Sequence, residues 1–490
     1  MSTTAGTYAA YLVQRDGVKY KVRGQYMNGA YSCRCRPDDL FIVQRGSTFY
    51  KSTWNNFWNT SLDGTIYNHF DATPNDNNGN YWWRVRYDPE SRVILMPYNH
   101  EIIYYRVFGS VPSGSFNPYT YYYSGWIEMY RNSSDPKPYG DSVKDIWNVN
   151  GRWYVLTSLT TSWSATDRTV WTISFDPDTD FAYNTIETPS NWSQVNGITD
   201  TTNPFYIEEI KYLNGLYVAI GQKSVNGTDR GFLVADTSEF FNSSNKVEIV
   251  FDGTNTSASS ASESNIYDIA YANNTWYVGG GGGRLHTASS TLSSSTSWTT
   301  MVGRAIGPVR RVVTNGTTVV TAGDGSSSLS SPVKIWRYDG SAQTPTWTQS
   351  TVNGTNFLQY PMDMKYADGK FVLSGKAFPY YETGVTAADL DKSVLYSEDD
   401  GVTWNIVTTE AHRRFSTDPP NTTHTNRAID TIFYLPHSKT WFVTGYWTFN
   451  KLNFTKTYNF LDTDLFLSAS GYNPPSPYKV TGQYFKNTIP

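Results

Sequence analysis

Residues 210–221 read IKYLNGLYVAIG, and this stretch is the clearest indication of the fold. Runs of aliphatic and aromatic residues lie on either side of Asn214-Gly215. An Asn-Gly pair in that setting is a strong signal for a β-hairpin, because both central residues of a type I′ turn need positive φ. The stretch therefore predicts two antiparallel strands joined by a two-residue turn.

The same hairpin pattern occurs seven times along the chain. Each copy has a β-rich run, a short turn and a second β-rich run that ends in small residues. The other six copies span residues 83–96, 143–156, 266–280, 309–323, 362–375 and 429–445.

Two more β-rich runs complete most of these units. A third run follows the hairpin, as at residues 231–234, and a fourth often begins at a tryptophan, as at Trp298 and Trp404. The units recur roughly every 40–70 residues, and four strands per unit are typical of β-propeller blades of about 40–50 residues, so these would be long blades with inserted loops. We therefore predict an all-β fold in which residues 62–470 form a seven-bladed β-propeller. An antiparallel sandwich is the structural alternative, but it would not need seven matching units.

A turn motif near the end of the sixth unit favours the propeller. Residues 397–404 read SEDDGVTW and match S-x-D-x-G-x-T-W, the Asp-box of sialidase-like and other propellers. We expect Asp399 to accept backbone N–H groups, Gly401 to take positive φ and Trp404 to pack between blades. Ser397 and Thr403 complete the motif. It predicts a structural turn and says little about activity.

A second repeat lies before the propeller. An arginine, followed five residues later by a Tyr-Lys pair, occurs twice in matching sequence surroundings. We interpret this small β-rich module as an attachment module. Its repeated residues are Arg15, Tyr20, Lys21, Arg45, Tyr50 and Lys51.

The C-terminus carries an echo of this module, because residues 478–485 are similar to residues 20–27. We therefore divide the chain into a repeated β module at residues 1–61, the propeller at 62–470 and a C-terminal echo at 471–490. Residues 464–479 are alternatively the outer half of the last blade.

Composition excludes several protein classes. Of the 490 residues, 17% are charged and 16% are aromatic, and the formal net charge is −4. The aromatic content argues against disorder, and the net charge leaves no electrostatic basis for nucleic-acid binding. Cys33 and Cys35 alone cannot build a disulfide framework. Since no apolar stretch is long enough to span a bilayer and no signal peptide is recognisable, we expect no membrane insertion.

The N-terminal module resembles a known family. Residues 38–51 read DDLFIVQRGSTFYK, which is similar to the "DLFLVQRGGTxYK" module of structural proteins from marine tailed phages, cyanophages especially. The resemblance implies a virion protein associated with the tail, as a fibre, tail tip or baseplate component. It also implies assembly in the host cytoplasm, a homo-oligomeric state within the virion, and other tail proteins as partners.

We expect no enzymatic activity, cofactor or metal. A sialidase-type site would need an arginine cluster, and the arginines of the propeller are dispersed. Arg310 and Arg311 are adjacent, but neighbours on a strand point to opposite faces. The six histidines show no spacing typical of metal ligands. A glycan depolymerase with carboxylates at some other spacing stays open as an alternative.

Binding is more plausible than catalysis. Two aromatic stretches fall in loop-like contexts, where aromatic rings can contact sugars or protein partners. They make a host cell-surface glycan a candidate partner, and a glycan-binding lectin is the alternative function. The other interpretation is that these rings pack within the fold or between subunits. The residues are Tyr121, Tyr122, Trp126, Tyr380 and Tyr381.

Overall fold

The structure is a computed structural model of the 490-residue chain. Outside the ranges that follow, it describes only the backbone of the strands named below. Side chains are described for residues 145–157, 169–174, 192–198, 206–254, 256, 262–289, 291–325, 332–342, 346–354, 358–375, 394–407, 431–434 and 441.

Most of the described strands belong to four-stranded antiparallel sheets whose strands neighbour one another in chain order. These sheets are β6 (Arg86–Asp88), β7 (Val93–Tyr98), β8 (Glu101–Arg106) and β9 (Trp126–Glu128); β10 (Ser142–Val149), β11 (Arg152–Ser158), β12 (Arg168–Ile173) and β13 (Ser193–Gln194); β14 (Phe205–Leu213), β15 (Leu216–Val225), β16 (Thr228–Asp236) and β17 (Val247–Phe251); β18 (Ile266–Ala272), β19 (Thr275–Gly280), β20 (Leu285–Ser289) and β21 (Thr299–Met301); and β22 (Val309–Thr314), β23 (Thr318–Gly323), β24 (Lys334–Asp339) and β25 (Trp347–Gln349).

The last two sheets vary this plan. A five-stranded sheet has the usual four antiparallel strands, and the short β26 pairs in parallel with the last of them. The final sheet has three strands. Their members are β26 (Thr351–Val352), β27 (Leu358–Ala367), β28 (Lys370–Ala377), β29 (Val394–Ser397) and β30 (Thr403–Ile406), then β31 (Ile429–Leu435), β32 (Thr440–Gly445) and β33 (Thr448–Lys451).

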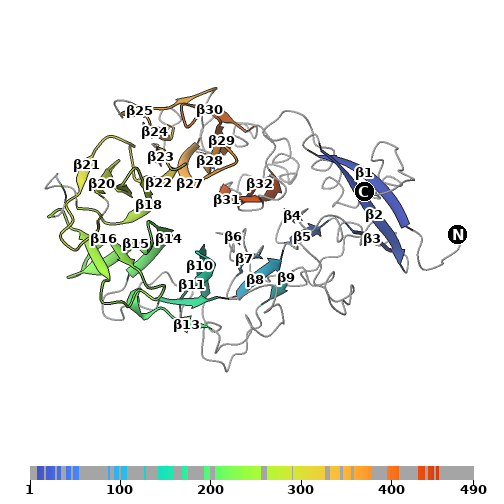
Figure 1. Cartoon of the computed structure of the whole chain (residues 1–490), viewed down its shortest axis with the longest axis horizontal. Coiled ribbons are helices and arrows are strands. Elements are labelled where there is room, and N and C mark those ends of the chain that lie inside the picture. The colour runs from blue at the N-terminus through green and yellow to red at the C-terminus, as the bar shows by residue number, and fades with distance from the viewer. Residues whose placement is uncertain are drawn as a thin grey trace, which may run out of the picture.

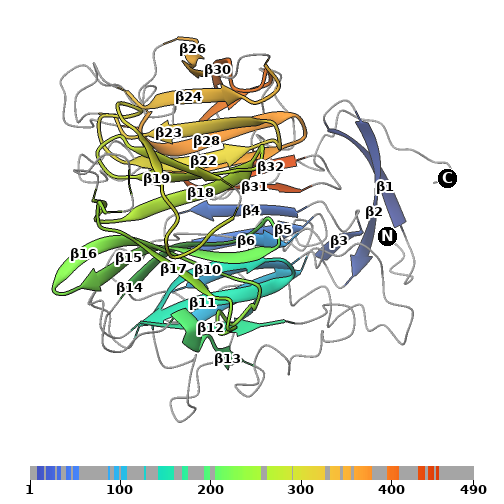
Figure 2. The same ribbon diagram turned by 60° about the vertical axis from the view of Figure 1, so that its left-hand side comes forward.

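These sheets follow one another around a common centre (Figures 1 and 2). The first strand of each sheet lies on the inner side, and consecutive first strands contact one another from β10 through β14, β18, β22 and β27 to β31. The prediction of an all-β fold built from four-stranded antiparallel units is thereby confirmed, and the arrangement is propeller-like.

Short turns join β10 to β11, β14 to β15 and β27 to β28. In the quoted stretch, Asn214 and Gly215 have φ of 51° and 78°, as a type I′ hairpin requires. The predicted turns at Asn150 and Asp368 are alike, with φ of 52° and 48° followed by a glycine at positive φ. Local sequence thus determines where each hairpin reverses.

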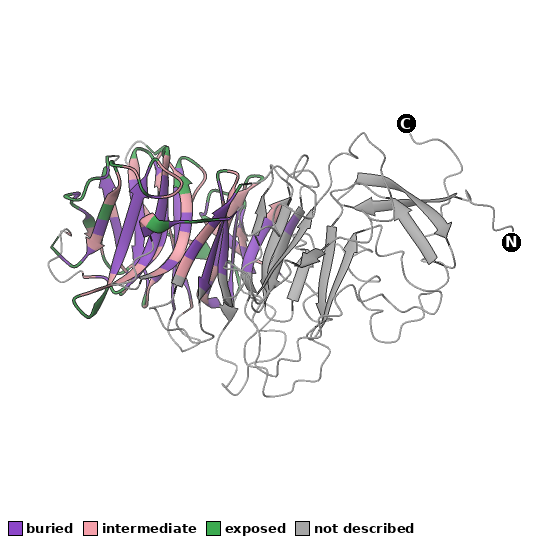
Figure 3. Cartoon of the chain, turned by 90° about the horizontal axis from the view of Figure 1, so that it is seen from below, coloured by how far each residue is buried: buried purple, intermediate pink, exposed green. Residues whose placement is uncertain are grey.

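The core lies between neighbouring sheets. Val218, Ile220 and Leu233 of one sheet pack against Ile269 and Trp276 of the next, and all are fully buried. Figure 3 shows the buried residues along the middle of the strands and the exposed ones in the turns. Apolar burial of this kind is the main term that holds one sheet against the next.

The repeated N-terminal segment forms two similar hairpins. In the first, Tyr20 is opposite Val13, and in the second, Tyr50 is opposite Val43. The strands are β1 (Tyr8–Arg15), β2 (Val18–Met27), β3 (Ala30–Arg34), β4 (Leu40–Arg45) and β5 (Thr48–Thr53), and β4 lies beside β33. The C-terminal echo at 471–490 lies outside the described residues.

Candidate functional site

The first strands of six consecutive sheets carry a β-bulge at a matching place, where the pairing register skips one residue. Bulges change the direction of nearby side chains and are common beside functional sites. The region around the central strands is therefore the candidate functional site. The skipped residues are Lys144, Glu208, Tyr267, Arg310, Met362 and Asp430.

Aspartates directly after a bulge link neighbouring sheets. The Oδ2 atom of Asp268 accepts a hydrogen bond from Val312 N of the next sheet at 2.8 Å. Asp363 Oδ2 accepts one from Ile432 N at 2.8 Å in the same way. The two aspartates are only 3% and 7% exposed, so water does not compete for these bonds. Each carboxylate therefore joins the first strand of its own sheet to the backbone of the first strand of the next sheet.

Cationic side chains extend these links. Lys211 Nζ reaches from β14 to the carboxylate of Asp268 and to Ile269 O on β18. In β22, Arg311 occupies the position directly after the bulge, where Asp268 and Asp363 stand in their own strands. Its Nε donates to Met362 O at 2.6 Å. Together with the two aspartates, these groups tie five consecutive central strands, from β14 to β31, by hydrogen bonds of their side chains.

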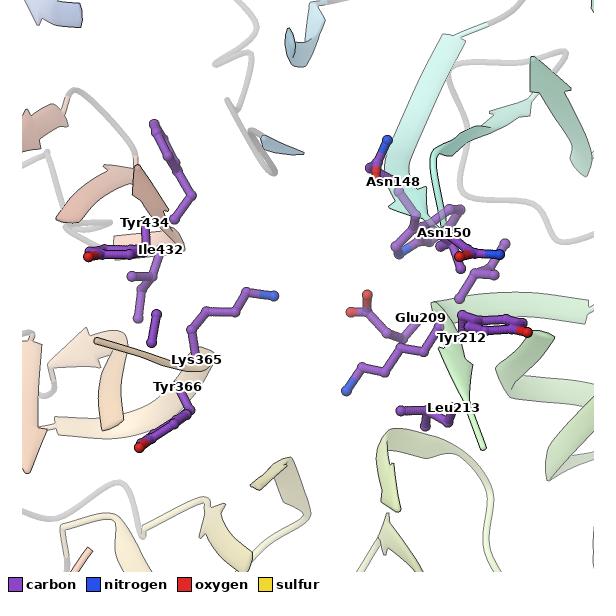
Figure 4. Close-up of a pocket in the computed structure, with 15 residues that line it drawn as sticks. Asn148, Asn150, Glu209, Tyr212, Leu213, Lys365, Tyr366, Ile432 and Tyr434 are labelled. Carbon is purple, nitrogen blue, oxygen red and sulfur yellow. The ribbon is translucent and has the colours of Figure 1, made fainter. Parts of the chain in front are cut away.

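A cavity of about 460 Å³ lies toward the hairpin ends of β10, β14, β27 and β31. Lys365 and Glu209 reach toward one another from opposite sides of its opening (Figure 4). Lys365 Nζ is 3.5 Å from Asp363 Oδ1, and Asn148 Nδ2 is buried without a hydrogen-bond partner among the described residues. The cavity therefore has room and polar groups of both kinds for a small polar ligand.

Tyrosines occupy matching positions near the hairpin ends of the strands around this opening. Tyr212 packs on Tyr217 of the next strand with ring centroids 4.9 Å apart, and Tyr366 packs on Phe371 at 4.7 Å. The labelled rings of Tyr212, Tyr366 and Tyr434 point away from the opening (Figure 4). Burial, with the neighbouring Asp368, raises the pKa of Tyr434 to about 12. These rings brace the hairpins and do not face a ligand in the cavity.

Arg310 lies near the beginning of β22, at the strand end opposite the hairpin turn. Its Nε donates to Asp324 Oδ1 at 2.6 Å, and its guanidinium lies 5.0 Å from the ring centroid of Tyr267 and 5.9 Å from that of Tyr360. Burial raises the pKa of Asp324, and the bond to Arg310 opposes that rise. This arginine is thus positioned by one carboxylate and two rings.

A row of buried polar side chains at the β18–β21 sheet consists of a hydroxyl, an imidazole and a carboxylate, like a catalytic triad. His286 lies 3.0 Å from Thr300 Oγ1 and 2.9 Å from Glu263 Oε1, and Arg284 Nη1 donates to that carboxylate at 3.1 Å. His286 and Glu263 are fully buried, so a substrate cannot reach them. The row satisfies buried polar groups and is not a candidate active site.

The Asp-box turn has its residues close together. Asp399 Oδ1 accepts from Thr403 N at 2.9 Å and from Ser397 Oγ at 2.7 Å, and Gly401 has a φ of 81°. Burial opposes the effect of these hydrogen bonds, but they hold the pKa of Asp399 below its usual range. Trp404 is fully buried between the β22–β25 sheet and its own, so the motif fastens two sheets together.

The remaining candidate residues from the sequence are not placed. Tyr121, Tyr122, Tyr380 and Tyr381 lie outside the described residues, and Trp126 is described only as backbone in β9. The same holds for the side chains of the attachment module. Their roles stay predictions.

Sequence reasoning missed the links made by the aspartates and the setting of Arg310. The signal was present for the first. An acidic residue stands three positions before a Tyr or Asn in four of the hairpin copies, and Asp145, Glu209, Asp268 and Asp363 are those residues. No pattern in the chain indicates that Asp324 and Tyr360 meet Arg310.

Within the described residues, no group of three or more His, Cys, Asp or Glu side chains could hold a metal ion. None of the described helices has the length and apolar character needed to cross a membrane.

Comparisons with known proteins assign the chain to no family. No family model and no curated protein matches it. One solved structure with a similar chain path is Raptor from Chaetomium thermophilum, at 12% identity and a TM-score of 0.42. The match covers 76% of this chain but only 28% of the Raptor chain. YCF48 from Cyanidioschyzon merolae matches at 11% identity and a TM-score of 0.40, over 76% of this chain and 95% of that one. The mitotic checkpoint complex contains a chain with 8% identity and a TM-score of 0.40, over 78% and 99%. Similarities this distant say nothing about function.

Proposed function

We propose that this chain is a structural protein of a phage virion, associated with the tail, which acts in assembly and in adsorption to the host surface. The observation that carries the proposal is the segment at residues 38–51, which resembles the module of phage structural proteins. In this proposal the module attaches the chain to other tail proteins, and the sheets around the centre face partners or the host.

The finer architecture in the proposal is a seven-bladed β-propeller. It is supported by the order of the sheets, which begin at β6, β10, β14, β18, β22, β27 and β31. It is further supported by contact between β31 and β6, since a closed propeller brings its last blade against its first.

An interaction role agrees with the chemistry of the centre. Asp268, Asp363 and Arg311 are committed to hydrogen bonds that join sheets, which leaves them unavailable as acids, bases or substrate clamps. The cavity beside them favours one further candidate, a lectin for host glycans, because Lys365 and Glu209 offer a donor and an acceptor to sugar hydroxyls.

The first experiment locates the chain in purified particles by cryo-electron imaging with a label on its C-terminus. Density at the tail tip, baseplate or fibres is the expected result. Density at the neck or on the capsid would contradict the tail assignment, and a chain absent from particles would contradict the virion role.

A variant tests the attachment module. Arg45→Ala with Tyr50→Ala should lower incorporation into particles several-fold while the melting temperature of the purified chain changes little. The control is Asp229→Ala, an exposed residue outside the module, which should leave incorporation and melting temperature unchanged. If the second-copy variant unfolds the whole chain, attachment and folding are not separate and the proposed role of the module is wrong.

The lectin candidate is tested by glycan-array binding of the full chain and of Lys365→Ala. Specific binding that the substitution abolishes would support it. Release of reducing sugar ends from a bound polysaccharide would instead indicate a depolymerase.

A further inference from the structure

Arg310 is held in one orientation by a partner that cannot move. Asp324 is 3% exposed, and its carboxylate accepts from Arg310 Nε at 2.6 Å. The backbone of Asp324 is fixed as well, because its N donates to Pro308 O at 2.9 Å and its O accepts from Ile306 N at 3.1 Å. The guanidinium is therefore attached to a rigid point of the fold.

Two tyrosine rings restrict the guanidinium further. Tyr267 belongs to β18 and Tyr360 to β27, so the rings come from the sheets on either side of β22. Arginine stacks on aromatic faces through cation–π attraction, which limits its rotation. An arginine ordered in this way loses little further freedom when it binds a ligand.

The terminal nitrogens of Arg310 have no hydrogen-bond acceptor among the described residues. Nε is its hydrogen-bond donor to Asp324, and no residue in the described ranges accepts from Nη1 or Nη2. The side chain as a whole is 30% exposed. Arg311 next to it differs, because its nitrogens donate to the backbone carbonyls of Met362, Tyr267 and Arg310.

We propose that Arg310 anchors a binding site for a single carboxylate group. A guanidinium edge with two parallel N–H donors matches the two oxygens of a carboxylate. Asp324 already balances much of the charge, and Glu208 acts on Arg310 electrostatically from β14. A doubly charged phosphate would meet that negative field, whereas a singly charged carboxylate gains the paired hydrogen bonds at a lower electrostatic cost.

The ligand class is defined by this carboxylate. Acidic sugars and glutamate side chains of a partner both carry it, and small matched probes separate the two sources. The inference rests on the geometry around Arg310 and does not depend on the virion role, so either can fail without the other.

The test is ligand-observed saturation-transfer NMR on the full-length chain with two matched pairs of probes. Galacturonate is compared with galactose, and N-acetylglutamate α-amide is compared with N-acetylglutamine α-amide. We expect saturable binding of at least one carboxylate probe and binding about tenfold or more weaker for its neutral counterpart, as loss of a charge-assisted hydrogen bond predicts. Galacturonate alone would identify an acidic sugar, and the glutamate probe alone an acidic side chain.

Two variants connect binding to the guanidinium. Arg310→Gln should abolish the preference for the carboxylate probes. Arg310→Lys keeps a charge for Asp324 but lacks the planar edge, so it should stay folded and lose about tenfold in affinity. The matched control is Arg284→Gln, since Arg284 also pairs with a fully buried carboxylate and is 26% exposed, but no aromatic ring of a described residue stacks on its guanidinium.

The proposal is wrong if neutral and carboxylate probes bind equally. It is also wrong if Arg310→Lys, shown to be folded by its melting curve, binds carboxylate as tightly as the unsubstituted chain. The folded control Arg284→Gln should bind as the unsubstituted chain does. Inorganic phosphate, added as a competitor, that displaces the bound carboxylate probe at concentrations below that probe's own Kd would likewise overturn the argument from charge.

Discussion

At the scale of single residues, charged side chains in this protein join backbones together. Asp268 accepts from the backbone N–H of Ile269 at 2.7 Å and of Val312 at 2.8 Å, and it receives Lys211 as a third donor. A buried carboxylate is costly unless its oxygens are satisfied, and here three donors from three strands satisfy it. The carboxylate of Asp268 therefore links β14, β18 and β22.

Removal of this link should be among the more damaging point changes. We expect Asp268→Ala to lower the free energy of unfolding by about 3 kcal/mol, because it leaves two buried N–H groups without an acceptor and removes the ion pair with Lys211. Urea denaturation measures this. Asp229→Ala is the control, since Asp229 is exposed and its loss should cost no more than about 0.5 kcal/mol. Equal effects of the two substitutions would contradict the role of Asp268.

At the scale of elements, glycine in the turns has two distinct uses. Gly215 has a φ of 78°, and a Cβ added there would meet nothing within 4 Å. Gly401 has a φ of 81°, but a Cβ there would lie 2.8 Å from Cγ2 of Val320 in the neighbouring sheet. The hairpin turn needs only the backbone conformation, whereas the Asp-box turn also needs the space.

This difference can be measured with one substitution at each site. Gly215→Ala should cost about 1 kcal/mol, the penalty of a left-handed residue with a Cβ. Gly401→Ala should cost about 1–3 kcal/mol more, because it also forces the Asp-box turn away from Val320. Chemical denaturation of both variants gives the comparison. Equal costs would mean that the Asp-box turn is not pressed against the next sheet.

At the scale of the whole molecule, turn aspartates in different sheets share a lowered pKa. Asp236, Asp339 and Asp399 each belong to a separate sheet, and each carboxylate accepts hydrogen bonds from Ser or Thr side chains and backbone in its own turn. For Asp236 and Asp399 these bonds outweigh burial, which opposes them, and for Asp339 the side chain of Ser341 is the largest cause. The same chemistry therefore fastens one turn in each of these three sheets.

The sign of the pH dependence follows from this direction. Because the pKa of each carboxyl is lower in the folded chain than in the unfolded chain, the stabilisation is present above the unfolded value of about 3.9 and is lost as the pH falls through the folded values. We expect the melting temperature to be nearly constant at neutral pH and to fall progressively below about pH 4. Thermal melts followed by circular dichroism measure it.

Asp399→Asn is the matched variant for this prediction. It should melt lower than the unsubstituted chain at pH 7 and show a smaller further loss in acid, since one titrating group is gone. A chain whose stability rises as the pH drops from 5 to 3 would contradict the assignment of these carboxylates.

The sequence by itself determined the local elements. The hairpin turns at Asn150, Asn214 and Asp368 and the Asp-box turn at Asp399 depend on φ preferences and on side-chain bonds within a few residues, so their patterns are visible in the chain. The all-β class followed from the same repeats. Tertiary structure alone decided which charges meet across sheets.

Arg310 illustrates the reason. Its partner Asp324 follows the next strand of its own sheet, and Tyr267 and Tyr360 belong to the sheets on either side. These contacts depend on how sheets pack and on the bulge that turns the Arg310 side chain, and both are set by burial summed over many residues. A local sequence pattern does not contain this information, so the contacts at the centre of the molecule could be identified only from the three-dimensional structure.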